Sequence, residues 1–170
     1  WVDERAVPPT HKDSNYKLAS DLFLSKSGVG EVFRMNGEQT DLHEAANEYA
    51  RTLKSRFIPE SVSFDAVLLG MGEDGHIASL FPAMPGLDRA LDVQQAAAAL
   101  VGHAPVQPQV RLSLNLSMLL STRWLGLLVF GERKRELIES VLADSHGSRE
   151  WPLHALLRQS RVLPNIYWAP

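Results

Sequence analysis

The stretch over residues 69–82, with the sequence LGMGEDGHIASLFP, constrains the fold of this chain most. It follows a short, continuous apolar run over residues 64–69, which is typical of a strand buried on both faces of a parallel sheet. In open α/β sheets, ligands bind in the crevice outside the carboxyl ends of the strands. The sequence therefore predicts that Asp74 and His76 lie at such a crevice, in a glycine-rich turn followed by a short helix that Pro82 closes.

The rest of the chain alternates between helix and strand patterns. Asp41 and Glu44 resemble a capping box at the start of the clearest helix, and Asp13 or Ser14 is expected to cap an earlier one. Helices are predicted at 14–24, 41–57, 132–143 and 153–158, and strands at 1–3, 32–35, 64–69, 100–103, 110–114, 124–130 and 165–168. This order predicts an α/β fold: a three-layer α/β/α sandwich with a mostly parallel, Rossmann-like sheet.

Length and composition bound the class of protein. With 170 residues, a single domain over 1–170 is expected, and a first residue other than methionine, Trp1, suggests that the amino end is truncated. The absence of cysteine excludes disulfides, thiolate metal ligands and a cysteine nucleophile. A formal net charge of −3 gives no global attraction for nucleic acid, and no apolar run approaches the roughly 20 residues of a membrane span. We therefore expect a soluble, cytoplasmic protein without nucleic-acid or membrane partners.

Gly70, Gly72 and Gly75 spell the G-x-G-x-x-G pattern of dinucleotide-binding proteins. Two features argue against that interpretation. Glu73 and Asp74 would bring negative charge to the place where a pyrophosphate should bind, and Pro82 leaves too few residues for the long helix that the fingerprint opens.

The residues alone leave two interpretations of Asp74 and His76 open. Asp74 could cap the short helix, with His76 merely packed beside it. Alternatively, the carboxylate orients the imidazole and stabilises its charged form, as a general base requires. A metal site is disfavoured because two ligands are too few. The other histidines show no paired spacing and are expected to be surface or satisfied residues: His11, His43, His103, His146 and His154.

Two further groups of charges stand near predicted strand ends. Asp3, Glu4 and Arg5 end the first strand, where they either meet solvent or, if this strand neighbours the 64–69 strand, place Arg5 in the crevice with His76. A basic run over residues 133–135 opens a helix. Such a run is usually a solvated helix face, but cations are unfavourable at a helix amino terminus unless an anion such as phosphate lies between them.

Together the segments DER with PP and DSN after it, LGMGEDGHIASLFP, RLSLNL and FGERK closely resemble the 6-phosphogluconolactonase family along nearly the whole chain. Glucosamine-6-phosphate deaminases share the sheet and a related turn, but they typically continue that turn with Phe-Asn-Glu-Pro and carry Asp-Glu-Tyr at the earlier strand. Ser79 and Arg5 stand at these positions here, which favours the lactonase.

The resemblance implies hydrolysis of 6-phospho-D-glucono-1,5-lactone to 6-phosphogluconate in the oxidative pentose phosphate pathway, with no cofactor and no metal. It implies that His76 activates water as a general base and then protonates the ring oxygen, while Asp74 orients it. Arg5 would hold the lactone or stabilise the oxyanion, and Arg111 and Lys134 would bind the 6-phosphate. The other expected binding residues are Asp3, Asn15, Gly70, Gly72 and Gly75. The complete protein is expected to be a monomer.

The chain also departs from the family pattern. Family members begin with a helix and a strand ending in a Ser-Gly-Gly-type loop that contributes to the phosphate site, and the sequence lacks this segment. Ala6 replaces a common aromatic residue, and Ser117 replaces a common proline. The alternatives are therefore an aminosugar-phosphate deaminase and a non-catalytic sugar-phosphate-binding module.

Overall fold

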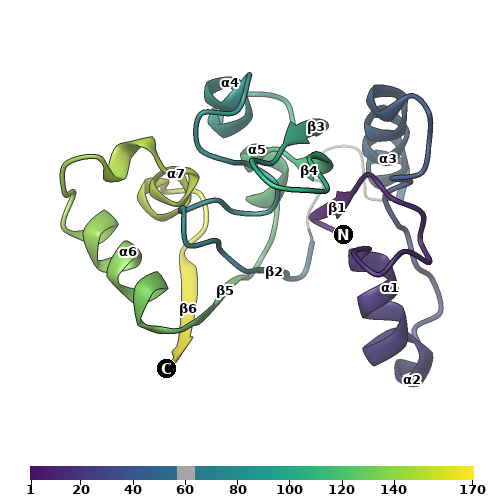
Figure 1. Cartoon of the computed structure of the whole chain (residues 1–170), viewed down its shortest axis with the longest axis horizontal. Coiled ribbons are helices and arrows are strands. Elements are labelled where there is room, and N and C mark those ends of the chain that lie inside the picture. Colours follow the sequence, from purple (N-terminus) through teal and green to yellow (C-terminus); the bar gives the residue numbers. More distant parts are fainter. Residues whose placement is uncertain (57–63) are drawn as a thin grey trace.

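The strands form two small sheets in the computed structural model, which describes residues 1–56 and 64–170 (Figure 1). The parallel sheet contains β2 (Val67–Leu69), β5 (Leu125–Phe130) and β6 (Pro164–Ala169), with β5 in the middle. The antiparallel sheet contains β1 (Asp3–Arg5), β4 (Val110–Leu114) and β3 (Ala99–His103), with β4 in the middle.

The helices lie around these two sheets. In Figure 1, α6 and α7 accompany the parallel sheet, whereas α3 packs against the antiparallel one. Their bounds are α1 (Asn15–Ala19), the π-helical η1 (Ser20–Leu24), α2 (Ser25–Ser27), α3 (Leu42–Arg56), α4 (Leu87–Leu91), α5 (Leu116–Leu119), α6 (Glu132–Leu142), the 3₁₀-helical η2 (Ser148–Glu150) and α7 (Pro152–Arg158). No helix of the described residues is long and apolar enough to cross a membrane.

The α/β fold class is confirmed, but only part of the structure has the expected parallel arrangement. Strands β3 and β4 are joined by residues 104–109, a connection short enough for a hairpin, whereas parallel strands need a crossover of a dozen or more residues. Strand β1 also pairs with β4 in antiparallel register. The pairing of the first strand with the 64–69 strand, one of the two alternatives considered for Asp3, Glu4 and Arg5, is not formed among the described residues.

Three local predictions were wrong. Residues 32–35 form no strand, and the first strand is at Asp3–Arg5 rather than at residues 1–3. The glycine turn leads into no helix: isolated bridges join Met71 to Ile77 and Ile77 to Leu80 instead. These bridges take up backbone groups that a helix would need, so Asp74 cannot be a helix cap.

Strand β2 is not buried on both faces, because the Leu68 side chain is 53% exposed. Among residues 1–56 and 64–170, β2 pairs with β5 and with no other strand. Leu68 instead lines a largely apolar hollow of about 390 Å³ whose other walls include Trp1, Val2 and Leu114.

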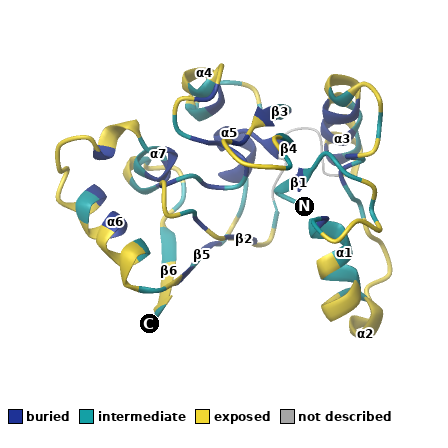
Figure 2. Ribbon diagram, in the orientation of Figure 1, coloured by how far each residue is buried: buried dark blue, intermediate teal, exposed yellow. Residues whose placement is uncertain are grey.

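Figure 2 shows buried residues in the middle of the molecule, in α5, β4 and β5, and on one side each of α3 and α6. Leu125, Leu127 and Val129 of β5 are fully buried, and α6 contributes a buried stripe to the same core. Helix α3 buries its own stripe, as predicted from the periodicity; the predicted end of that helix at residue 57 lies outside the described residues. The helical stretch from Asn15 to Ser27 is mostly exposed, in contrast.

The predicted cap of α3 is half formed. The carboxylate of Asp41 accepts the backbone N–H of Glu44 at 3.0 Å. The carboxylate of Glu44 bonds to Arg51 instead of returning to the cap residue, so the reciprocal bond of a capping box is not made. The earlier helix is capped by Ser14, whose hydroxyl accepts the N–H of Lys17 at 3.1 Å.

Replacement of Leu127 by alanine tests the position of the core. We expect Leu127→Ala to lower the free energy of unfolding by about 2–5 kcal/mol, because the lost methyl groups leave a cavity in the central strand of the parallel sheet. Urea denaturation followed by circular dichroism measures the effect. Leu163→Ala is the matched control, since its side chain is 83% exposed; equal losses for both variants would contradict this assignment of the core.

Candidate active site

The glycine turn brings Asp74 and His76 into direct contact. Oδ1 of Asp74 lies 2.6 Å from Nδ1 of His76 and also accepts the backbone N–H of the same histidine at 3.2 Å. The imidazole side chain is 29% exposed. Because the carboxylate can only accept hydrogen bonds, the contact places the imidazole proton on Nδ1 and leaves Nε2 as an acceptor.

Two of the glycines are required by the packing of this turn. A Cβ at Gly72 would overlap Nδ1 of His76 and approach Oδ1 of Asp74 to 2.5 Å. Gly75 has φ +79°, and a Cβ there would lie 2.8 Å from the Trp151 side chain. Gly70, in contrast, faces open space, so its position allows a small side chain.

The turn crosses from the parallel sheet onto the antiparallel one. The hydroxyl of Ser79 donates to Oδ2 of Asp3 at 2.7 Å, and the backbone N–H of Ser79 donates to the hydroxyl of Ser113 at 3.2 Å. Gly102 of β3 lies beneath, where a Cβ would meet the carbonyl oxygen of Ser79 at 2.6 Å. The turn and the DER strand therefore meet through side chains, although β1 and β2 are not paired.

Arg5 and Arg111 stand opposite each other in the antiparallel sheet. Cross-strand partners project from the same face, so the two guanidinium groups are neighbours. The pKa of Arg111 is lowered, first by burial and then by the charge of Arg5. Nε of Arg111 donates to the carbonyl of Pro108 at 2.7 Å, and no described residue accepts from its terminal nitrogens. The nearby carboxylates of Asp3, Asp13 and Glu4 act on this pKa in the opposite direction. Two adjacent guanidinium groups with free terminal nitrogens can still bind an anion.

Phe81 connects the two halves of the site. Its ring lies 4.3 Å from the imidazole of His76, centroid to centroid. The guanidinium carbon of Arg111 is 6.0 Å from the centre of the same ring. His76 and Arg111 therefore both lie close to one buried aromatic ring.

Glu4 joins the DER strand to the residues that follow it through several hydrogen bonds. This carboxylate is 3% exposed and accepts the backbone N–H groups of Arg5, Asn15 and Tyr16 together with the hydroxyl of Ser14. It ties β1 to the start of α1. Sequence reasoning assigned Glu4 no role, because nothing in the DER segment indicates which charge turns inward.

Asp3 and Asn15, both predicted to bind substrate, are hydrogen-bonded to other residues of the protein. Nδ2 of Asn15 donates to the carbonyl oxygen of Asp3 at 3.0 Å and to its Oδ1 at 3.2 Å. Burial raises the pKa of the Asp3 carboxyl, partly countered by the bond from Ser79. These contacts fit a supporting role under the turn.

Arg5 is only partly free for a ligand. Its Nη1 donates to the carbonyl oxygen of Asp13 at 2.7 Å, and its Nε is buried without a hydrogen-bond partner among the described residues.

Lys134 stands at the start of α6, after the carboxyl end of β5. The neighbouring arginines are neutralised by glutamates of the same helix: Arg133 by Glu136, and Arg135 by Glu132 and Glu139. Lys134 has no ion pair within residues 1–56 and 64–170. No hydrogen bond or ion pair in that part of the chain joins it directly to His76 or Arg111.

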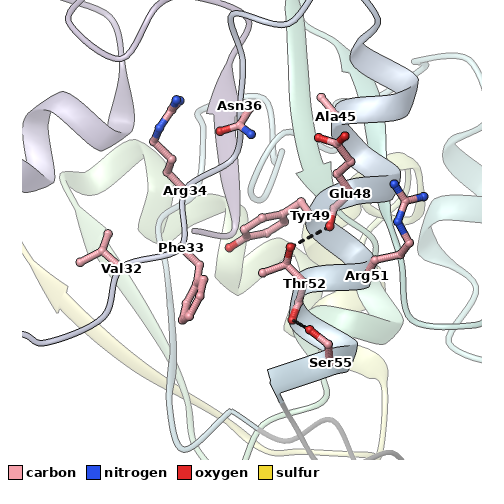
Figure 3. A pocket seen from close by; sticks show the side chains of 10 residues that line it. All are labelled: Val32, Phe33, Arg34, Asn36, Ala45, Glu48, Tyr49, Arg51, Thr52 and Ser55. Carbon is pink, nitrogen blue, oxygen red and sulfur yellow. Dashed lines mark hydrogen bonds between the residues drawn. The ribbon is translucent and has the colours of Figure 1, made fainter.

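A hollow of about 570 Å³ between residues 32–36 and α3 is a weaker candidate for the site (Figure 3). The hydroxyl groups of Thr52 and Ser55 donate to carbonyls of the same helix, and the hydroxyl of Tyr49 donates to the carbonyl of Trp1. Its charged side chains already have partners: Arg34 with Glu38, Arg51 with Glu44, and Glu48 with Gln39. An anionic ligand would find no unpaired cation there.

The described residues hold no group of three or more histidine, aspartate or glutamate side chains that could bind a metal ion. His154 lies 3.4 Å from Asp144, and His11 accepts the N–H of Asp13. His43, His103 and His146 are exposed.

The comparisons with known proteins fit this geometry. A model of the family described as "Glucosamine-6-phosphate isomerases/6-phosphogluconolactonase" matches residues 1–168. The chain belongs to this family. The 6-phosphogluconolactonase of Rhizobium meliloti (strain 1021) is 34% identical over 169 residues, which cover 99% of this chain and 71% of the relative. A crystal structure of a 6-phosphogluconolactonase from Shewanella baltica OS155 superposes with a TM-score of 0.82 at 28% identity, covering 98% of this chain and 69% of the other.

Plant members of the family are longer. The 6-phosphogluconolactonase 3 of Arabidopsis thaliana, named as chloroplastic, is 39% identical over 153 residues, which cover 84% of this chain but 46% of the relative. The chain thus spans less than half the length of this plant relative.

Exchanging Gly72 for alanine tests the contact between Asp74 and His76. We expect Gly72→Ala to separate the two side chains, because the added methyl group occupies the space of Nδ1. The ¹⁵N chemical shifts of the imidazole, which report the tautomer, should change toward a mixture of both forms. Gly70→Ala is the control, with no atom within 4 Å of its added Cβ. An unchanged tautomer in Gly72→Ala would refute the geometry.

Proposed function

We propose that this chain carries the catalytic groups of a 6-phosphogluconolactonase, which hydrolyses 6-phospho-D-glucono-1,5-lactone to 6-phosphogluconate. One observation carries the proposal. The imidazole of His76 has its Nδ1 bonded to Asp74 at 2.6 Å and lies against the same phenyl ring, that of Phe81, as Arg111, a buried arginine with no ion pair among the described residues. A base beside an anion-binding cation is what a phosphorylated ester substrate requires.

The reaction follows from the acceptor state of Nε2 of His76. This nitrogen takes a proton from water as the water oxygen bonds to the carbonyl carbon of the lactone. The bond between that carbon and the ring oxygen then breaks, and the imidazolium returns the proton to the departing oxygen. One C–O bond forms and one breaks, so water is added without any redox step. Asp74 stabilises the imidazolium in between.

The cations hold the substrate in this proposal. Arg111 binds the 6-phosphate through its terminal nitrogens, which donate to no described residue. Lys134 supplies a second charge from the amino terminus of α6, where an anion is also favoured by the helix dipole. Arg5 lies beside Arg111 and stabilises the oxyanion, an electrostatic contribution typically worth about 3–4 kcal/mol for one good donor.

The assay is the formation of 6-phosphogluconate above the spontaneous hydrolysis rate, with ammonia release from glucosamine 6-phosphate measured in parallel. The second reaction is included because the family description covers both activities. Lactone turnover without ammonia supports the proposal, and ammonia release assigns a deaminase. Binding of 6-phosphogluconate in calorimetry without turnover of either substrate would assign a binding module.

We expect His76→Asn to lower kcat by about 10²–10⁴-fold, the usual contribution of a general base. The measurement is the steady-state rate of lactone hydrolysis, corrected for the blank. His146→Asn is the matched control, because its side chain is exposed. Full activity of His76→Asn would rule out His76 as the general base. The protein would then be a lactonase that activates water through another group.

Arg111→Lys tests the phosphate site. Lysine keeps the charge but loses the bond from Nε to the carbonyl of Pro108 and the planar fork that matches a phosphate. We expect KM for the phosphorylated lactone to rise by about 10–100-fold with a small change in kcat, since a hydrogen bond between charged groups contributes about 1.5–3 kcal/mol. Arg123→Lys, at an exposed ion pair with Asp65, is the control. A fall in kcat at unchanged KM would place Arg111 in the chemical step instead.

A further inference from the structure

Trp151 contacts the catalytic turn from a distant part of the sequence. It stands between η2 and α7, and its side chain is half-buried. A Cβ at Gly75 would lie 2.8 Å from both Cβ and Cγ of Trp151, and 3.3 Å from the indole Cδ2. The glycine backbone therefore packs directly against the first atoms of this side chain.

A backbone hydrogen bond fixes the same contact. Pro152 occupies the first position of α7 and has no N–H, so the first free donor of the helix belongs to Leu153. That N–H donates to the carbonyl oxygen of Gly75 at 2.9 Å. The start of α7 thus holds the turn by an apolar contact on one side and a hydrogen bond on the other.

The segment that carries Trp151 is itself well anchored. Leu153 and Leu156 of α7 are fully buried. Arg158, at the end of α7, donates to the carbonyl oxygens of Val141 and Leu142, which ties the helix to the end of α6. Because α7 is fixed to the core, the residue at its start, Trp151, has a defined position and can hold Gly75 in place.

Gly75 lies between the two proposed catalytic side chains in the sequence. Its φ of +79° sets the direction in which the chain turns from Asp74 toward His76. We propose that Trp151 is a positioning residue for the catalytic pair: through Gly75, its indole holds the turn in the shape that keeps Asp74 and His76 in contact. This inference rests on the proposed lactonase function.

The test compares Trp151→Ala and Trp151→Phe in the protein at its natural length. We expect Trp151→Ala to lower kcat by about 10–100-fold with KM within a factor of about two, because a small displacement of a catalytic group affects the chemical step more than binding. Trp151→Phe should recover most of the lost rate, since its ring keeps the contact with Gly75. Trp124→Ala is the matched control: this indole also covers a glycine, Gly126, but in the parallel sheet.

A second measurement separates the positioning role from the proposed activity. The ¹⁵N shifts of the His76 imidazole report the tautomer whether or not the protein hydrolyses the lactone. In Trp151→Ala we expect a smaller population of the tautomer of His76 that is protonated on Nδ1. In Trp124→Ala we expect the population of this tautomer to be unchanged. Unchanged shifts and kcat in folded Trp151→Ala would overturn the inference. If that variant does not fold, the same two readouts in Trp151→Ser decide the inference, because serine lacks the ring carbons that touch Gly75. An inactive parent protein would refute only the lactonase function.

Discussion

The bond from the Ser79 hydroxyl to the carboxylate of Asp3 joins the two halves of the candidate site. No ladder of backbone hydrogen bonds connects β2 to β1 in the described part of the chain, so contacts of this kind determine how the two sheets meet at the turn. Gly102 allows the close approach, because any side chain there would displace Ser79. The placement of His76 relative to Arg111 therefore depends on a few small residues rather than on strand pairing.

The sequence predicted those elements whose signal is local. The strand at Leu125–Phe130 and the helix at Glu132–Leu142 follow from apolar patterns that do not depend on a partner. The antiparallel sheet was not predicted, because pairing is a non-local property and three-residue strands such as β1 carry little pattern. Only the short connection over residues 104–109 indicates the hairpin. The exposure of Leu68 likewise depends on what lies beside β2, which an apolar run does not specify.

The same distinction applies to the site. The motif placed Asp74 and His76 in one turn, and the structure shows them in contact. The roles of Glu4 and Trp151 arise from contacts with residues elsewhere in the chain, so composition and spacing carried no signal for them. Lys134 is the reverse case. The sequence singles out the basic run over residues 133–135, because cations are unfavourable at the start of a helix. It does not indicate which of the three side chains lacks an ion pair; the ion pairs of Arg133 and Arg135 in the structure show that it is Lys134.

The backbone of the turn is strained at Ala78, so the residues packed around the turn are needed to hold its conformation. Ala78 has φ +47°, a left-handed conformation that costs a residue with a Cβ about 1–2 kcal/mol. Such a conformation persists only where the surroundings over-determine it. Its neighbours Ile77 and Ser79 are both fully buried, one in the core and one against the antiparallel sheet. Burial on both sides of Ala78 therefore fixes the turn from within. His76, immediately before this buried pair, keeps a defined orientation while its ring stays accessible to solvent.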